Sequence, residues 1–178
     1  AEMQLQEVLT DHAYCEQKAA SSCISLILRF NDLQELVDTL TPIVAEEWGH
    51  FERVLEQIRS RGLEFGFPRK DEYVIQLSGF VKKGGSRVQQ LTEQLLMNAL
   101  IEARSCERFK LLSNQLNDPE LKKFYYELMV SEAGHYVTFI ELAKKYHEPI
   151  KVHERWQEWL NFEAEVMKNL EVRGDRIH

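Results

Sequence analysis

A short pattern, Glu-x-Gly-His-aromatic, occurs twice in the 178-residue chain and constrains its fold more than any other feature. It occupies residues 47–51 and recurs 85 residues further on, at residues 132–136. The dipeptide Asn-Asp also occurs twice, at residues 31–32 and 86 positions later at residues 117–118. Because Asn and Asp favour turns and helix starts, we interpret the repeat as one helical hairpin that is present twice.

Four glutamates are placed symmetrically about these two turns. Two residues of an antiparallel hairpin face each other when they are equally far from the turn. Glu16 and Glu47 are centred on residues 31–32, and Glu102 and Glu132 are centred on residue 117. At a rise of about 1.5 Å per residue, all four lie at one level, roughly 23 Å from each turn.

Each repeated pattern also supplies a histidine three positions after its glutamate, on the same helix face. One Glu from each of two helices, with Glu-x-x-His from each of the other two, is the ligand set of carboxylate-bridged di-iron bundles. Two divalent ions would neutralise four buried carboxylates, and oxygen and imidazole ligands suit iron or manganese better than structural zinc. We therefore predict a two-iron site with six ligands: Glu16, Glu47, His50, Glu102, Glu132 and His135.

Three neighbouring residues leave alternatives open. Glu107 could replace Glu102 as a ligand, although its midpoint with Glu132 falls off the turn. Glu46 precedes a ligand and could either orient a histidine or be exposed. His12 lies one turn before Glu16 and could be a ligand, but we expect a solvated helix histidine there.

Other residues near the repeats are expected to have structural roles. Glycine inside a helix costs about 1 kcal/mol relative to alanine, so Gly49 and Gly134 suggest a close approach beside the ligands. The three cysteines are expected to be small core residues. Core packing is likewise favoured over electron transfer or cavity lining for three aromatic residues: Tyr14, Trp48 and Tyr136.

Helical periodicity extends over most of the chain, and strand patterns are absent. The first predicted helix stops at residues 31–32. Asp32 with Glu35 has the form of a capping box for a second helix that runs to Arg61. Because Pro42 lies inside this second helix, we expect a kink or a break just before Thr41. Residues 62–85 are predicted to form a long connection that contains a short helix.

Three more helices follow this connection. The third spans roughly residues 86–116, and the fourth starts at residues 118–119 and ends near residue 147. The last covers about residues 153–172 and carries three aromatic residues on one stripe: Trp156, Trp159 and Phe162. The predicted fold is all-α: a ferritin-like four-helix bundle with a long crossover between helices 2 and 3 and an additional C-terminal helix.

Composition limits the remaining possibilities. The length fits a single domain over residues 1–178, and three cysteines without a CxxC pair indicate neither a disulfide framework nor a thiolate metal site. With no long apolar run and no cationic leader, we expect a cytoplasmic protein without membrane insertion. The net charge of −7 argues against a general nucleic-acid coat but leaves room for a local basic patch.

Four segments resemble the tRNA-(2-methylthio-N6-isopentenyl-adenosine) hydroxylase family. They read DHAYCEQKAA at residues 11–20, EEWGHF at 46–51, IEARSCERF at 101–109 and SEAGHY at 131–136. The resemblance implies a non-haem di-iron enzyme that uses dioxygen and two electrons to hydroxylate the isopentenyl group of the modified adenosine. It also implies two partners, the tRNA anticodon stem-loop and an electron-donating reductase system.

A basic stretch could bring such an RNA to the metals. Residues 59–87 contain three acidic residues and seven basic ones: Arg59, Arg61, Arg69, Lys70, Lys82, Lys83 and Arg87. These side chains could contact phosphates, or the stretch could be an ordinary solvated loop. The alternative function is a ferritin- or rubrerythrin-type protein that oxidises iron or reduces peroxide, and either a monomer or a small oligomer is compatible with the sequence.

Overall fold

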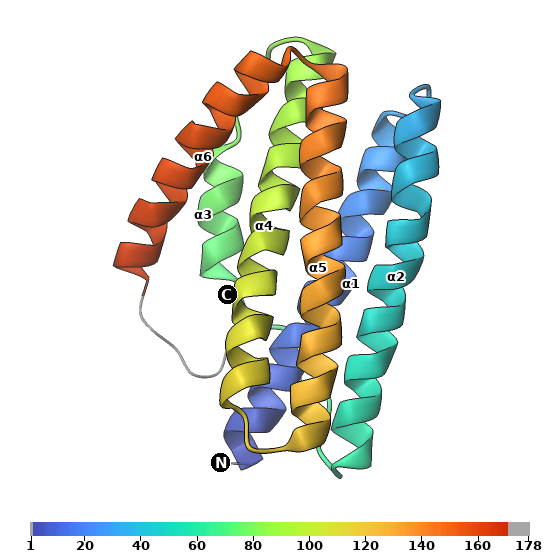
Figure 1. Ribbon diagram of the computed structural model, residues 1–178, viewed down its shortest axis with the longest axis vertical. Helices are drawn as coiled ribbons and strands as arrows, with labels where there is room; N and C mark the ends of the chain where they lie inside the picture. Colours follow the sequence, from blue (N-terminus) through green and yellow to red (C-terminus); the bar gives the residue numbers. More distant parts are fainter. Residues whose placement is uncertain (1, 171–178) are drawn as a thin grey trace. The chain divides into compact units, whose positions relative to one another are not determined.

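The structure is a computed structural model that describes residues 2–170. The regular structure of this part of the chain is entirely helical, in agreement with the prediction (Figure 1). The chain divides into two compact units, the first ending at Lys70 and the second beginning at Asp71. Each unit contains one copy of the repeated hairpin, and a single domain that comprises both stays a prediction.

The first unit is an antiparallel hairpin of two long helices, α1 (Glu2–Arg29) and α2 (Gln34–Ser60). The predicted turn position is confirmed, but the predicted capping box is wrong. The N-cap of α2 is Leu33, which makes no side-chain cap hydrogen bond. The turn is instead tightened by the backbone, where the N–H of Leu33 donates to the carbonyl of Phe30 over 3.0 Å, and Phe30 and Leu36 are buried at its base.

Pro42 does not break α2, which runs unbroken from Gln34 to Ser60. A proline removes one backbone N–H and crowds the carbonyl four residues earlier. Pro42 lies on the exposed face, so water can reach that carbonyl. The Thr41 hydroxyl beside it donates to the carbonyl of Val37 over 2.7 Å.

The second unit contains the other long hairpin, α4 (Arg87–Gln115) and α5 (Pro119–Tyr146). Ser86 caps α4 with a complete capping box, in which its hydroxyl accepts from the N–H of Gln89. Asp118 caps α5, and its carboxylate accepts from the backbone N–H groups of Glu120 and Leu121, which follow Pro119 in the first turn. Both predicted helix starts are therefore confirmed within one residue.

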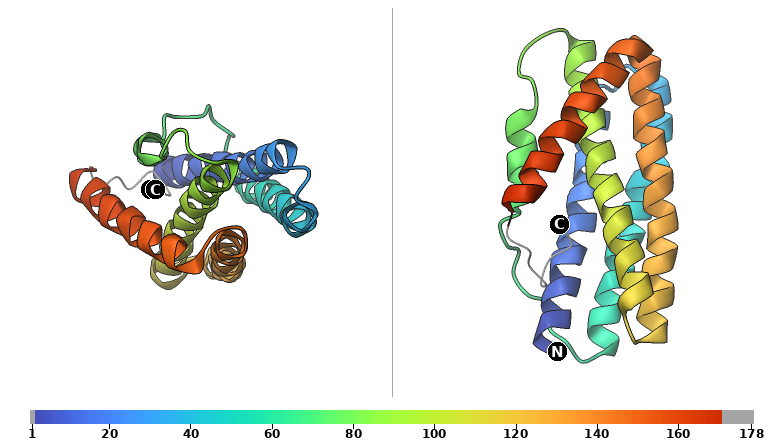
Figure 2. Two further views of the ribbon diagram at one scale, coloured as in Figure 1. Left: turned by 90° about the horizontal axis from the view of Figure 1, so that it is seen from above. Right: turned by 60° about the vertical axis from the view of Figure 1, so that its left-hand side comes forward.

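Two further helices cover one side of α4 in this unit, namely the short crossover helix α3 (Glu72–Phe80) and α6 (Pro149–Asn169). Figure 2 shows α6 crossing α4 obliquely with α3 beside it. Phe80 stacks on Phe162 with ring centroids 4.1 Å apart and meets Trp159 edge-on at 4.9 Å. The crossover helix is thus fixed to the predicted aromatic stripe of α6, whose start lies four residues earlier than expected and whose predicted end, Val172, lies outside the described residues.

A buried polar network adds to this packing. The Tyr73 hydroxyl on α3 donates to Glu163 of α6 over 2.9 Å, and the Arg104 guanidinium on α4 donates to the same carboxylate oxygen. Burial and the neighbouring Glu163 raise the pKa of Tyr73. In the part of the chain that the structure describes, no helix has the length and apolar character needed to cross a membrane.

Candidate metal centre

The first unit brings three of the predicted ligands together. Glu16 lies on α1, and Glu47 and His50 lie on the facing side of α2, at equal distances from the turn as the sequence predicts. All three are buried, Glu47 to 1% exposure. The Nδ1 atom of His50 lies 3.4 Å from Oε2 of Glu16 and 3.7 Å from Oε2 of Glu47. The three side chains offer ligand atoms within 4.8 Å of one another.

We call Glu16, Glu47 and His50 the first half site. His12 contacts this half site, and the prediction that it is solvated is wrong. Its side chain is fully buried, and Nε2 lies 2.6 Å from Oε1 of Glu16. The two oxygens of Glu16 therefore have different neighbours, since Oε1 contacts His12 and Oε2 faces His50. The spacing of His12 and Glu16, four residues apart on one helix, was the available signal.

The second unit repeats this arrangement with the other three predicted ligands, which form the second half site. Glu102 lies on α4, and Glu132 and His135 lie on α5. They are 5%, 1% and 4% exposed, and their ligand atoms lie within 4.8 Å of one another. The Nδ1 atom of His135 is 3.7 Å from Oε2 of Glu132, the same separation as between His50 and Glu47.

The two alternative glutamates lie elsewhere. Glu107 is exposed, and its carboxylate pairs with the Arg104 guanidinium at 2.6 Å. Glu46 is also exposed, whereas the next residue, Glu47, is buried. Glu102 and Glu47 are therefore the buried carboxylates of their segments, as the turn midpoints predict.

The interpretation of the two glycines is wrong. Beyond the neighbouring backbone of its own helix, a Cβ atom built on Gly49 or Gly134 would meet none of the residues that the structure describes within 4 Å. Neither glycine is required by a close approach, and nothing in the structure explains why both repeats carry one.

The cysteines and aromatic residues divide between core and surface. Cys23 is buried, and desolvation raises the pKa of its thiol to about 12, which keeps it a neutral thiol. Tyr136 packs on Trp156 with ring centroids 6.0 Å apart. Trp48, in contrast, is 45% exposed, so the prediction of core packing is wrong for it.

The seven basic residues of the stretch 59–87 belong to both units. Arg59, Lys70, Lys83 and Arg87 are exposed. Arg61 donates to the carbonyl of Gln57, and Arg69 donates to the carbonyl of Glu7 over 3.4 Å. Lys82 forms an exposed ion pair with Glu158 at 2.8 Å. The exposed side chains remain accessible for phosphate contacts, which stay a prediction.

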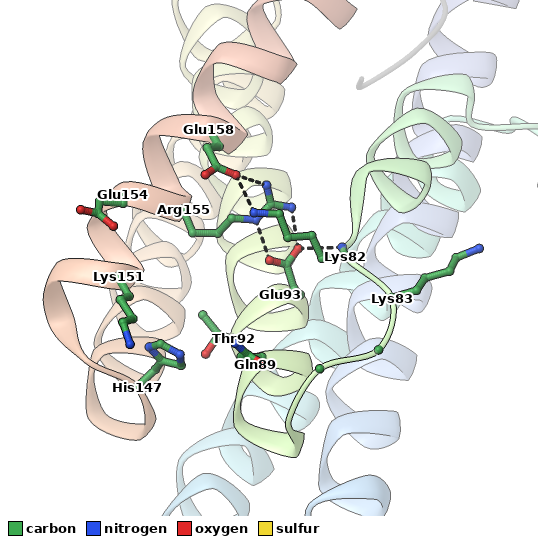
Figure 3. A pocket seen from close by; sticks show the side chains of 12 residues that line it. Lys82, Lys83, Gln89, Thr92, Glu93, His147, Lys151, Glu154, Arg155 and Glu158 are labelled. Carbon is green, nitrogen blue, oxygen red and sulfur yellow. Dashed lines mark hydrogen bonds and ion pairs between the residues drawn. The ribbon is translucent and has the colours of Figure 1, made fainter.

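A polar cavity of about 460 Å³ lies in the second unit between the end of the crossover, α4 and α6 (Figure 3). Its wall is organised by Arg155, which donates to both oxygens of Glu93 over 2.6 and 2.7 Å and to the carbonyl of Phe80 over 3.0 Å. Glu93 also accepts from the backbone N–H of Lys82. The buried charges of its wall, Arg155 and Glu93, pair with each other and with the crossover backbone. We therefore interpret these contacts as structural, since they fix the crossover to α4 and α6.

The six predicted ligands fit iron by their chemistry. Each unit presents two buried carboxylates and one imidazole, a donor set of oxygen and nitrogen that suits iron or manganese. Buried carboxylates are costly without compensating charge, and two divalent ions would compensate four of them.

A comparison with solved structures tests the predicted fold. A solved structure titled "Protein 43 with aldehyde deformylating oxygenase activity from Synechococcus" matches 97% of this chain and 86% of its own, with a TM-score of 0.91 and 32% identity. The ferritin-like fold class predicted from the sequence is thereby confirmed.

Two curated relatives are also similar in sequence, and both are named tRNA 2-(methylsulfanyl)-N(6)-isopentenyladenosine(37) hydroxylase. The one from Pseudomonas putida is 38% identical over 139 residues, which is 78% of this chain and 66% of the relative. The one from Salmonella typhimurium is 34% identical over 113 residues, which is 63% of this chain and 40% of the relative. The chain thus spans less than two thirds of the length of either relative.

The family model described as tRNA-(MS[2]IO[6]A)-hydroxylase (MiaE) matches residues 1–178. With the fold, the two half sites and the relatives in agreement, the chain belongs to this hydroxylase family.

Proposed function

We propose that this chain is a dioxygen-dependent di-iron hydroxylase that acts on the isopentenyl group of 2-methylthio-N6-isopentenyl-adenosine in tRNA. The observation that carries the proposal is the matched pair of buried half sites, each with two glutamates and one histidine, in a chain of this family. The six side chains that hold the two irons in this proposal are Glu16, Glu47, His50, Glu102, Glu132 and His135.

The protein's own residues would position the metals and balance their charge. Four carboxylates offset the four positive charges of two ferrous ions, so that the loaded site is neutral. His12 contacts Oε1 of Glu16 and Oε2 faces His50, so His12 would orient this carboxylate as a ligand. When bound, two ferrous ions would supply the reduction of dioxygen and the insertion of one oxygen atom into a C–H bond, with two electrons from a reductase and the other oxygen released as water.

The partners in this proposal are the tRNA anticodon stem-loop and an electron-donating reductase system in the cytoplasm. Exposed basic side chains of residues 59–87 would contact the RNA phosphates. A ferritin- or rubrerythrin-type activity is not favoured, because the family match and both curated relatives are hydroxylases.

The test is product formation on the proposed substrate. Iron-loaded protein is incubated with reductant, dioxygen and tRNA that carries the modified adenosine, and the nucleosides are analysed by mass spectrometry. One added oxygen is expected with the wild type and with Glu46→Ala, which removes the exposed neighbouring carboxylate, but not with Glu47→Ala. No added oxygen from a protein that contains both irons and oxidises them in air would favour the ferritin- or rubrerythrin-type reading instead.

A further inference from the structure

The segment that follows α2, residues 61–70, is held against α1 by several hydrogen bonds. The Tyr14 hydroxyl donates to the carbonyl of Gly66 over 3.0 Å, and the N–H of Gly66 donates to the Thr10 hydroxyl over 3.3 Å. A Cβ atom at Gly66 would lie 3.3 Å from the Thr10 methyl carbon, so the two segments approach closely. The segment is therefore an ordered part of the first unit, although it has no helix of its own.

This ordered segment carries aromatic side chains that remain exposed. Phe65 stacks on Tyr14 with ring centroids 4.8 Å apart and meets Phe51 edge-on at 6.2 Å. Phe51 in turn contacts Trp48 at 4.9 Å, which makes one continuous aromatic row from α1 to α2. Trp48 and Phe65 are 45% and 41% exposed, and Phe67 is 91% exposed. A fixed segment that presents a phenylalanine to solvent forgoes the gain from burying it, which indicates a binding surface.

Basic side chains flank the aromatic ones in the sequence. Arg59 and Arg61 precede them, Arg69 and Lys70 follow, and Glu64 is the one acidic residue between positions 59 and 70. Arg59 and Lys70 are exposed. Exposed aromatic rings beside positive charges are the combination that binds single-stranded nucleic acid, in which rings stack on bases and cations contact phosphates.

We propose that Trp48, Phe65 and Phe67 form a stacking surface for unpaired bases of the tRNA loop. This inference rests on the proposed function and names the part of the protein that receives the loop. Two rings of the row, Trp48 and Phe51, lie on α2, the helix that also carries the proposed ligands Glu47 and His50. A loop base stacked on Trp48 would therefore bind to the helix that carries two of the proposed ligands.

Binding and turnover can be measured separately. Binding is followed by fluorescence anisotropy with an unmodified anticodon stem-loop, and with a blunt duplex of the same stem, on iron-loaded protein kept free of dioxygen. Phe67→Ala and Trp48→Ala should each weaken stem-loop binding by about 5- to 150-fold, the range for loss of one stacked base, and should leave duplex binding unchanged. The matched control is Tyr126→Ala, which removes a 57% exposed aromatic side chain from α5 and should change neither.

Two results would overturn the stacking surface, and a third would separate it from the proposed function. The first is that the Phe67→Ala and Trp48→Ala variants bind the stem-loop like the wild type while circular dichroism shows intact helices. The second is that these variants lose only reductase-driven turnover, which would assign the surface to a protein partner. Stem-loop binding that depends on Phe67, in a wild type that adds no oxygen to the modified tRNA, would support the surface and refute the hydroxylase.

Discussion

The Arg155–Glu93 pair provides a stability prediction whose size follows from the structure. Both residues are buried, at 6% and 5% exposure, and the guanidinium makes two hydrogen bonds to the carboxylate and one to the carbonyl of Phe80. Arg155→Met leaves the Glu93 carboxylate buried without this partner. Removing one member of a buried ion pair costs about 3–5 kcal/mol, which for a chain of this size corresponds to a Tm lowered by roughly 6–20 °C.

The assay is chemical denaturation of the metal-free protein followed by circular dichroism. Lys82→Met is the matched control, because it removes an exposed ion pair with Glu158 and should cost at most about 1 kcal/mol. The double variant Glu93→Leu/Arg155→Met removes both buried charges and should be more stable than Arg155→Met alone. The reasoning is refuted if Arg155→Met lowers the free energy of unfolding no more than Lys82→Met does. It is also refuted if the double variant loses as much free energy of unfolding as Glu93→Leu and Arg155→Met do when their separate losses are added.

Three further predictions concern the half sites and the thiols. His12→Phe removes the contact to Glu16 and should weaken Fe(II) binding by about 10- to 100-fold in a titration, whereas unchanged affinity would make His12 a packing residue. Glu102→Gln should lower the iron content per chain while Glu107→Gln leaves it unchanged, and the reverse result would exchange their roles. In a Cys15→Ser/Cys106→Ser protein, Cys23 should react with a thiol reagent at pH 8 roughly 10³-fold more slowly than an ordinary cysteine, because burial raises its pKa to about 12. Fast labelling of the folded protein at pH 8 would contradict the raised pKa. The stability that this neutral thiol contributes should be complete below about pH 8.5 and should be lost as the pH rises toward 12.

The hairpins and the half sites were predictable because they follow from spacing. The distance of Glu16 and Glu47 from one turn, repeated by Glu102 and Glu132 about the other, fixes which side chains face each other. Helix starts with strong local chemistry, such as Ser86 and Asp118, were predicted within one residue. The family was predictable from the residues around the ligands, and the match over the whole chain confirms it.

What the sequence did not predict depends on tertiary surroundings. Asp32 and Glu35 match the sequence pattern of a capping box, yet the N-cap of α2 is Leu33, whose N–H donates to the carbonyl of Phe30 in the turn. Pro42 is tolerated because its face of the helix is exposed. His12 is buried and Trp48 exposed against expectation, because helix periodicity alone does not say which neighbouring segment covers a given face.

The central claim is that three side chains from each unit jointly hold two irons. Protein loaded anaerobically with Fe(II), then oxidised and freed of excess metal, should contain two irons per chain, and Mössbauer spectroscopy should show them as one magnetically coupled pair. Glu47→Ala from the first unit and Glu132→Ala from the second should each abolish that coupled signal. One iron per chain, or two irons without magnetic coupling in the wild type, would contradict the claim.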